Sequence, residues 1–407
     1  MPVKKILLIS QHFWPETFQI NNVIDNLRKK KVEITVLTGL PNYPSGKIYK
    51  KYKSIKKLYY EMINGISIYR CPIIPRKNGG AIDLILNYLS FLINSFRYFS
   101  KLNLNKKFDL VFCYSTSPIT SAIPAIYFKI KYKKKAIIWV QDIWPDVVMS
   151  TKFIKNKFFY FILKKLSISI YSKFDLILIP FKSFKKKFKE YKLKNKIIYL
   201  PNSGYNIINK KQYIEKKILN LLNKNKCFTY AGNIGKAQNI TNILDAAYQL
   251  KKYKNIYFLI IGDGSELKKI KNIVEYKNLS NVQIIGHKKQ QFVQAIQNKS
   301  HALLLPLNSD PVYKLYIPNK FQSYLQSKKP IIGICSGETK KYIQRYKIGL
   351  CSEPNNQAQL LANILKVFNY KKDSIKKISL RMSKLYNKEF SSSKQTNKIL
   401  EIFNSQI

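Results

Sequence analysis

Short apolar runs alternate with longer, lysine-rich stretches along nearly the whole chain. A strand buried on both faces of a parallel sheet is apolar at consecutive positions, whereas a helix that covers the sheet is apolar on one side. The alternation therefore predicts the α/β class, with parallel sheets covered by helices. In the first half, the apolar runs predict strands at Lys5–Ser10, Glu33–Thr38, Ile66–Ile74, Asp109–Ser115, Ala136–Gln141, Asp175–Pro180 and Ile197–Pro201. The stretches between them predict helices, among them Ile20–Lys30, Thr120–Lys131 and Phe181–Lys192.

The alternation stops at Pro201–Lys217, where Pro, Asn, Ser and Gly predict a connection, and then resumes. The second series predicts strands at Cys227–Asn233, Tyr257–Gly262, Val282–His287, Ala302–Leu307, Ile331–Cys335 and Leu350–Glu353. Two series of similar length in 407 residues predict two Rossmann-like domains that face a central cleft. We expect domains over residues 1–203 and 204–385, with the helical stretch 386–407 able to pack back on the first.

The stretch Ala81–Leu102 is strongly apolar but is interrupted by Asp83, Asn87, Asn94 and Arg97. It predicts either an amphipathic helix inserted shallowly into one leaflet of a membrane or a helix packed on its own sheet, and both remain open. No uninterrupted apolar run reaches the roughly 18 residues that cross a bilayer. The apolar run near the N-terminus is shorter than the roughly 7–15 residues of a signal core, so it predicts a buried first strand.

The formal net charge of +52 raises the possibility of a polyanion-binding protein. Two observations weaken it: the lysines are spread along the chain, and arginine, the side chain best suited to phosphate and guanine, is rare. The six arginines are Arg28, Arg70, Arg76, Arg97, Arg345 and Arg381. We therefore expect no specific nucleic-acid partner, while the charge favours an anionic membrane surface.

The cysteines are odd in number and widely scattered, and most lie in apolar runs, so they predict neither a disulfide framework nor a zinc site. This usage favours a reducing cytoplasm. The five are Cys71, Cys113, Cys227, Cys335 and Cys351.

The strongest local motif is Gly232-Asn233-Ile234-Gly235-Lys236, at the end of a predicted strand and ahead of an amphipathic stretch. Glycines at such a turn let backbone N–H groups approach an anion, and a helix N-terminus together with a lysine favours a diphosphate. A second turn, Gly262-Asp263-Gly264, repeats the strand–glycine–helix pattern. An ordinary strand-to-helix turn is the alternative for both motifs.

A third motif places a cation at the start of another predicted helix. Pro318 suits a first helical turn, where its missing N–H costs nothing, so Lys320 is expected near the positive helix terminus. If the two βα units are neighbours, Lys320 stands beside the Gly235 loop, where a departing nucleotide diphosphate gathers charge. A solvated surface lysine is the alternative.

The motifs AGNIGKAQ, IIGDGSELK, VQIIGHKK and PNKFQSYLQSKKPIIG, with QHFWPE, LTGLPNYPSGKIY and WVQDIWPDVV in the first half, occur in a fixed order along nearly the whole chain. In that order they resemble the family 4 retaining glycosyltransferases of the GT-B fold. They look most like the branch with colanic-acid and O-antigen transferases, especially N-acetyl-L-fucosamine transferases with UDP-linked donors. The resemblance implies that the second domain binds the nucleotide sugar and the first binds the acceptor.

Carried over by position, the family's donor-binding residues fall mainly on the glycine turns and on the stretch that begins at Pro318. They are Gly232, Asn233, Gly235, Lys236, Gln238, Gly264, Gly286, His287, Pro318, Lys320, Gln322 and Ser323. Gly286 and His287 match the strand end beside the nucleobase, although His287 can equally be an ordinary turn residue.

This chain departs from the family pattern at four donor positions. The family usually has arginine at Asn233 and lysine at Gln238, so Lys236 and Lys320 are expected to supply the charge. Many relatives have glutamates where this chain has Leu315 and Ser323. The usual contacts to the donor ribose and sugar are therefore in doubt, and Gln322, Ser323 and Tyr324 are candidate polar substitutes.

In the first half, the resemblance aligns Gln141-Asp142 with a family His-Asp segment, so Asp142 can orient the acceptor hydroxyl or contact the donor sugar. A helix cap or turn acid is the alternative. Ligands of such sheets lie beyond the carboxyl ends of the strands, which makes His12, Trp14, Glu16 and Gln141 acceptor-side candidates. The predicted catalytic residues are therefore Asp142, Lys320 and Glu16.

These inferences predict a metal-independent, retaining hexosyltransferase with no cofactor. No Asp-x-Asp motif is present to bridge a metal to the donor. The resemblance implies retention at the anomeric carbon, in which case the departing phosphate oxygen can itself deprotonate the acceptor. The expected partners are a UDP-sugar, an undecaprenyl-diphosphate-linked saccharide and the cytoplasmic face of the inner membrane. The expected role is O-antigen or capsule assembly by a cytoplasmic, peripherally bound enzyme. A nucleotide-sugar 2-epimerase of the same fold and a non-enzymatic polyanion-binding protein are the alternatives.

Overall fold

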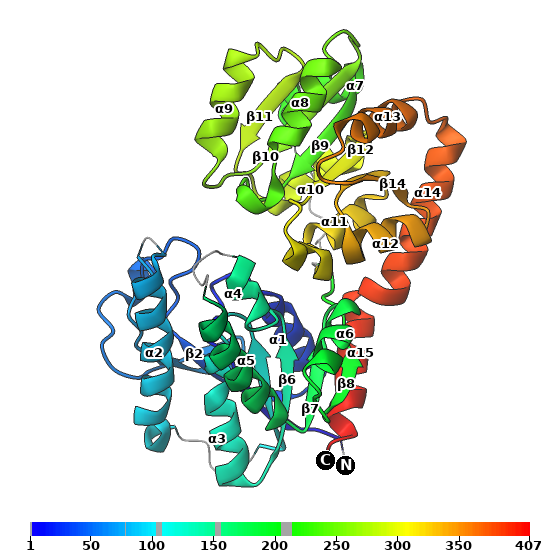
Figure 1. Ribbon diagram of the computed structural model, residues 1–407. Coiled ribbons are helices and arrows are strands. Elements are labelled where there is room, and N and C mark those ends of the chain that lie inside the picture. The colour runs from blue at the N-terminus through cyan, green and yellow to red at the C-terminus, as the bar shows by residue number, and fades with distance from the viewer. Residues whose placement is uncertain (1, 78, 103–107, 151–155, 205–213) are drawn as a thin grey trace. The chain divides into compact units, whose positions relative to one another are not determined.

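The computed structural model describes residues 2–77, 79–102, 108–150, 156–204 and 214–407 (Figure 1). The chain divides into two compact units, each built around one sheet. Unit 1 comprises residues 1–202 and 392–407, and unit 2 comprises residues 203–391.

Unit 1 contains an eight-stranded sheet in the order β3-β4-β2-β1-β5-β6-β7-β8. Its strands are β1 (Lys5–Ile9), β2 (Glu33–Gly39), β3 (Tyr59–Ile63), β4 (Ile66–Cys71), β5 (Leu110–Ser115), β6 (Lys135–Val140), β7 (Leu176–Ile179) and β8 (Lys196–Tyr199). All neighbours pair in parallel except β3, which runs antiparallel to β4. The sequence pattern missed β3, because this edge strand has only one buried residue and therefore no apolar run.

The helices of unit 1 cover both faces of this sheet. They are α1 (Gln19–Lys29), α2 (Ala81–Arg97), α3 (Ile123–Tyr132), α4 (Asp146–Ser150), α5 (Lys157–Ser172), α6 (Ser183–Glu190) and α15 (Ser392–Asn404), with the 3₁₀ helices η1 (Lys50–Tyr52), η2 (Phe99–Lys101) and η3 (Ile119–Ala122). α1 and α15 contact each other on one face, and α2, α3 and α5 lie on the other (Figure 1).

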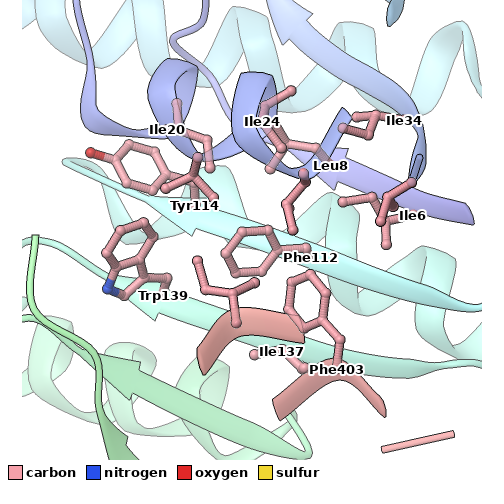
Figure 2. Close-up of a cluster of buried hydrophobic side chains, with 14 of the residues drawn as sticks. Ile6, Leu8, Ile20, Ile24, Ile34, Phe112, Tyr114, Ile137, Trp139 and Phe403 are labelled. Atoms are coloured by element: carbon pink, nitrogen blue, oxygen red, sulfur yellow. The ribbon is translucent and has the colours of Figure 1, made fainter. Parts of the chain in front are cut away.

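Figure 2 shows the core between the sheet and the α1–α15 pair. Phe112 of β5 packs edge-on against Phe403 of α15, with ring centroids 5.1 Å apart. Trp139 of β6 is fully buried, and its indole N–H donates to the Leu200 carbonyl at 3.2 Å. The last helix therefore completes the hydrophobic core of unit 1.

The helical pattern expected over 386–407 is interrupted in the structure. A π-helical turn, η6 (Tyr386–Phe390), is followed by Ser391 in an extended conformation before α15 begins. Side chains of α15 then bond to the end of the first βα series, where Gln395 donates to the Pro201 carbonyl and Lys398 to the Tyr199 carbonyl. These bonds fix α15 on unit 1.

Unit 2 contains a six-stranded, all-parallel sheet in the order β11-β10-β9-β12-β13-β14. Its strands are β9 (Lys226–Ala231), β10 (Ile256–Ile261), β11 (Val282–Gly286), β12 (Ala302–Pro306), β13 (Ile331–Ile334) and β14 (Gly349–Ser352). Its helices are α7 (Lys216–Lys224), α8 (Thr241–Gln249), α9 (Leu267–Tyr276), α10 (Gln290–Lys299), α11 (Lys320–Ser327), α12 (Gly337–Arg345), α13 (Gln357–Phe368) and α14 (Lys372–Leu385), with η4 (Lys236–Gln238) and η5 (Pro311–Leu315). β9 and β12 are the two central strands of this sheet. The loops that follow them therefore lie at the middle of the edge formed by the carboxyl ends of the strands, where a Rossmann-like unit binds its ligand.

Among the described residues, no helix combines the length and the apolar character needed to cross a membrane.

Candidate functional site

Two glycine turns of unit 2 pack backbone against backbone at the carboxyl ends of β9 and β10. Gly232 N–H donates to the Ile261 carbonyl at 2.9 Å, and Ile234 N–H donates to the Asp263 carbonyl at 2.8 Å. A Cβ atom on Gly262 would lie 1.8 Å from the Gly232 carbonyl oxygen, and Gly262 has φ +149°. Only glycine therefore fits there, and its absence of a side chain lets the turns meet.

The Gly235 turn is closed by side chains rather than by a long helix. The Gln238 Oε1 atom accepts from Gly235 N–H at 3.2 Å and from the Asn233 amide at 3.3 Å. The amphipathic helix predicted after this turn is present as α8, but it does not follow immediately. The short helix η4 comes first, left-handed Asn239 interrupts the chain, and α8 begins only at Thr241. The dipole of α8 therefore does not begin at Gly235, and positive charge near this turn must come from lysines.

Lys320, the first residue of α11, directs its ammonium group at the Gly232 turn. A Cβ on Gly232 would lie 2.8 Å from Lys320 Nζ. The ammonium donates to the Tyr230 hydroxyl at 2.7 Å and lies 3.9 Å from the centroid of that ring. Burial lowers the pKa of Lys320 to about 7. An anion bound here would favour the charged ammonium and reverse this shift.

Tyr230, at the end of β9, fixes the position of Lys320. Its hydroxyl donates to the Asn233 carbonyl, which leaves the oxygen lone pairs for the lysine ammonium. Burial raises the pKa of Tyr230 well above its ordinary value, so the phenol remains protonated. The sequence reasoning missed Tyr230, although its place two residues before Gly232, on a strand that ends at the predicted anion site, was a usable signal.

The structure brings together some of the predicted donor residues but not all of them. Gly264 lies against the same turn, since its Cβ would fall 2.7 Å from Asn233 Oδ1, and Gly286 accepts from Gly262 N–H at 2.9 Å. Lys236 and His287 are exposed. Among the described residues, no hydrogen bond, ion pair or ring contact joins His287 to this cluster.

The remaining candidates lie at or within α11. Pro318 lies two residues before α11, whose N-cap is Asn319, so it precedes the first helical turn in which it was expected; its carbonyl accepts from Phe321 N–H at 2.8 Å. Ser323 Oγ donates to the Lys320 carbonyl of its own helix, and Gln322 is buried. Tyr324 is a core residue whose hydroxyl donates to the Leu304 carbonyl at 3.0 Å. This hydroxyl therefore serves the sheet, which argues against Tyr324 as a substitute for a family glutamate.

In unit 1, Glu16 organises the loop that follows β1. One carboxylate oxygen accepts from the N–H groups of Asn42 and Tyr43, each at 2.7 Å, and the other lies 2.9 Å from His12 Nδ1. Both Glu16 and His12 are buried, and His12 stacks on Phe18 with centroids 4.9 Å apart. These contacts make Glu16 a group that holds His12 and the 42–43 backbone in place.

Arg70 supports the same loop and was not identified from the sequence. Its guanidinium is fully buried, forms an ion pair with Glu61 at 2.5 Å and donates to the Trp14 carbonyl at 2.6 Å. It also lies 5.0 Å from the Tyr52 ring. The Trp14 side chain itself is exposed, so its indole is available for a ligand.

Asp142 lies at the end of β6, where its carboxylate accepts from the backbone N–H and the hydroxyl of Ser117 at 3.1 and 3.0 Å. Burial raises its pKa above the ordinary value, while the Ser117 bonds act in the opposite direction. The Trp144 indole donates to the same Ser117 hydroxyl. The neighbouring Gln141 is buried and accepts from the Asn202 amide at 2.9 Å. The strand ends of unit 1 thus carry two carboxylates and several neutral hydrogen-bonding groups.

The residues that the sequence reasoning missed here are supporting ones. Ser117 lies in a different strand-end loop from Asp142, and Arg70 lies on β4 rather than in a motif. No pattern in the sequence joins them to their partners. Among the described residues, no cluster of three or more His, Cys, Asp or Glu side chains is arranged to hold a metal ion.

The chain is similar in sequence to known glycosyltransferases. Residues 211–382 match the family "Glycosyl transferases group 1". The chain is 20% identical to the putative colanic acid biosynthesis glycosyl transferase WcaI of Escherichia coli, over 69% of this chain and 70% of that one. It is 28% identical to the uncharacterized glycosyltransferase MJ1178 of Methanocaldococcus jannaschii, where the alignment covers 33% of this chain and only 36% of the relative.

Solved structures share the fold across almost the full length. The trehalose-6-phosphate structure from E. coli bound with UDP-2-fluoro glucose has a TM-score of 0.75 at 10% identity, and 99% and 100% of the two chains are covered. Anabaena Alr3699/HepE in complex with UDP-glucose has a TM-score of 0.67 at 12% identity, with 98% and 99% covered. The predicted GT-B fold, two Rossmann-like units with parallel sheets, is confirmed. The family match and the relatives support a glycosyltransferase.

Proposed function

We propose that this chain transfers a sugar from a nucleoside diphosphate to a hydroxyl of a saccharide acceptor. The observation that carries the proposal is the position of Lys320, whose ammonium lies against Gly232 where the two glycine turns meet. Unit 2 would bind the donor diphosphate there. HepE and the E. coli trehalose-6-phosphate structure hold UDP-sugars on the same fold, which supports a UDP-linked donor.

The chemistry follows from where charge develops. When the bond between the anomeric carbon and the donor phosphate breaks, negative charge grows on the departing diphosphate. Lys320 and the exposed Lys236 would stabilise that charge without a metal, because the N–H groups of the glycine turns already donate to protein acceptors. The departing phosphate oxygen would take the proton of the acceptor hydroxyl, and the sugar would be transferred with retention of configuration.

Unit 1 would bind the acceptor along its strand ends. Asp142, held by Ser117, would orient the reacting hydroxyl, and Glu16 would act through His12 and the 42–43 backbone. Trp14 and Gln141 would contact the saccharide. Glu16 is thereby reassigned from a catalytic to a positioning residue.

The finer assignment rests on the colanic-acid relative and on the sequence motifs. It is a UDP-N-acetyl-L-fucosamine donor or a related hexosamine, and an undecaprenyl-diphosphate-linked acceptor. The enzyme would act at the cytoplasmic face of the inner membrane in O-antigen or capsule synthesis.

A donor screen tests the proposal. The protein is incubated with a panel of UDP-sugars and a polyprenyl-diphosphate saccharide in vesicles containing EDTA, and released UDP and the labelled glycolipid are both measured. We expect one donor to yield equimolar UDP and glycolipid. UDP-sugar epimerisation without an acceptor would instead assign the epimerase alternative. Failure of every nucleotide to bind, combined with salt-sensitive binding of DNA, would assign the polyanion-binding alternative.

A further inference from the structure

Helix α2 of unit 1 exposes six of its large apolar side chains and buries several of its polar ones, although Phe91 is also buried. Its inner side carries Asn87, Ser90 and Ser95, all buried. Its outer side carries an apolar stripe at helical spacing, in which Ile82 is 74% and Ile93 is 60% exposed. The stripe consists of Ile82, Ile85, Leu86, Leu89, Ile93 and Phe96. Such a distribution is the reverse of that of a helix packed on a sheet in water.

Hydrogen bonds fix this orientation. Asn87 donates to the Ile74 carbonyl at 2.6 Å and accepts from Gln11 at 2.9 Å. Ser90 Oγ accepts from Ile74 N–H at 2.9 Å, and Asn94 donates to the Pro72 carbonyl at 2.8 Å. Turning the apolar stripe inward would break all of these bonds and leave buried backbone groups unpaired, which is costly. The stripe is therefore a stable feature of the surface.

Helix α5 presents a second apolar surface on the same face of the sheet. Phe158 is 69% and Phe161 is 52% exposed, whereas Ser167 is buried. Both α2 and α5 contact the 3₁₀ helix η3, and Figure 1 shows them with α3 on one side of unit 1. The two helices thus belong to one surface of the unit. Monomeric proteins rarely expose so many large apolar side chains without an interaction partner.

The charges around this surface complement anionic lipid. Neither α3 nor α5 contains an acidic residue, and the one acidic residue of α2, Asp83, pairs with Lys77 at 3.4 Å. Lys165 lies 4.6 Å from the Phe161 ring centroid, and Lys131 lies 4.9 Å from that of Phe99. Arg97 extends from the end of α2. A second copy of the chain would bring like charges together, whereas an anionic leaflet would attract these cations and accept the apolar side chains.

We propose that α2 and α5 form a membrane-docking surface that inserts shallowly into an anionic leaflet and holds unit 1 at the lipid. Only the role of this docking rests on the proposed function: it would bring the acceptor-binding loops of unit 1 to a lipid-linked substrate. The docking surface is defined as the exposed apolar side chains of α2 and α5 with their flanking lysines and arginine.

Vesicle co-sedimentation tests this proposal without any enzymatic readout. The full chain is mixed with vesicles of phosphatidylglycerol and phosphatidylethanolamine, or with neutral phosphatidylcholine, at low and high salt. We expect binding to the anionic vesicles that weakens with salt. The double variant Ile85→Glu with Ile93→Glu should lower the partition coefficient by about tenfold or more, and Phe158→Glu with Phe161→Glu should act in the same direction.

Leu380→Glu is the matched control, because Leu380 is 64% exposed in unit 2, outside the docking surface. Its partitioning should equal that of the original chain, and circular dichroism should show all variants folded. Ile85→Lys with Ile93→Lys separates insertion from attraction, since it removes apolar area while adding positive charge. It should bind anionic vesicles less well than the original chain.

Equal partitioning of the α2 variants and the original chain would overturn the proposal, as would failure of the original chain to bind anionic vesicles. Light scattering of the lipid-free protein supplies a third outcome. A dimer that the Ile85 and Ile93 substitutions dissociate would assign the surface to a second copy. Vesicle binding without UDP release would support the docking surface and contradict the proposed sugar transfer. UDP release without vesicle binding would support the transfer and contradict the docking surface.

Discussion

The strand ends of the two sheets share one architecture but differ in their charged groups. In unit 1, the carboxylates Glu16 and Asp142 are held by hydrogen bonds from neutral donors and from His12. In unit 2, backbone turns surround the ammonium of Lys320, which forms no ion pair with a carboxylate among the described residues. Under the proposed function, the same Rossmann frame would supply a surface for hydroxyl groups in one unit and a site for an anion in the other. The difference lies in a few loop residues, which agrees with the general rule that function resides in sites placed on common folds.

Gly262→Ala should have the largest effect on unit 2, because it disrupts the packing of the two glycine turns. A methyl group would lie 1.8 Å from the Gly232 carbonyl oxygen, so the two turns must separate. We expect the free energy of unfolding of unit 2 to fall by about 3 kcal/mol or more, measured by urea denaturation. Gly286→Ala is the control, because its φ of +73° imposes strain but its Cβ meets no atom within 4 Å. It should cost only about 1–2 kcal/mol. Equal losses for the two variants would refute the tight packing of the turns.

Lys320→Ala should have the largest effect on turnover. Removal of one preorganised charged donor should lower kcat by on the order of a hundredfold or more, as measured by UDP release. The variant should remain folded, because removing a partly buried cation that has no carboxylate partner among the described residues relieves its desolvation. Unchanged kinetics in a folded Lys320→Ala protein would exclude this lysine from the mechanism.

Asp142→Asn tests the proposed acceptor site of unit 1, and we expect a smaller effect on activity than that of Lys320→Ala. The amide keeps an oxygen that can accept from Ser117, but it removes the carboxylate charge. We expect kcat/KM for the acceptor to fall by about tenfold or more, as for loss of a hydrogen bond to a charged group, with UDP affinity unchanged. A drop in UDP affinity instead would show that Asp142 serves the donor.

Lys236→Ala should have the smallest effect. Lys236 is exposed, so water and salt screen its charge. We expect UDP affinity to fall by only about two- to fivefold at 0.1 M salt, with the difference shrinking at higher salt in calorimetric titrations. An effect as large as that of Lys320→Ala would mean that the exposed lysine carries the site.

The fold was largely accessible from the sequence because buried parallel strands leave continuous apolar runs. Thirteen of the fourteen described strands coincide with predicted runs to within a few residues. The exception, β3, is an edge strand with one buried side chain and therefore no such run. Local pattern also located the glycine turns, because a backbone contact that excludes Cβ requires glycine.

Other features were inaccessible because they depend on contacts between distant residues. The contacts of Tyr230 with Lys320 and of Ser117 with Asp142 each join different loops. The sequence also left open which side of α2 faces the sheet, for a related reason. The loop at 72–74 supplies backbone partners to Asn87, Ser90 and Asn94, and no periodicity in the helix itself reveals that these polar residues face inward.

The central claim is that Lys320 and the two glycine turns hold a diphosphate, and UDP binding at different pH values tests it directly. With a pKa of about 7 in the free protein, Lys320 is charged below that pH and largely neutral above it. A diphosphate prefers the ammonium, so binding takes up a proton, and UDP affinity should fall as pH rises from 7 to 9, approaching tenfold per pH unit at most. Lys320→Arg keeps its charge throughout and should flatten the profile.

Isothermal titration calorimetry in EDTA, with uridine as the ligand control, measures this profile in the original chain, Lys320→Arg and Lys320→Ala. We expect UDP to bind without metal, to bind more weakly at high pH only when lysine is present, and to lose affinity in Lys320→Ala. UDP affinity that is identical in the original chain and Lys320→Ala at every pH would contradict the central claim.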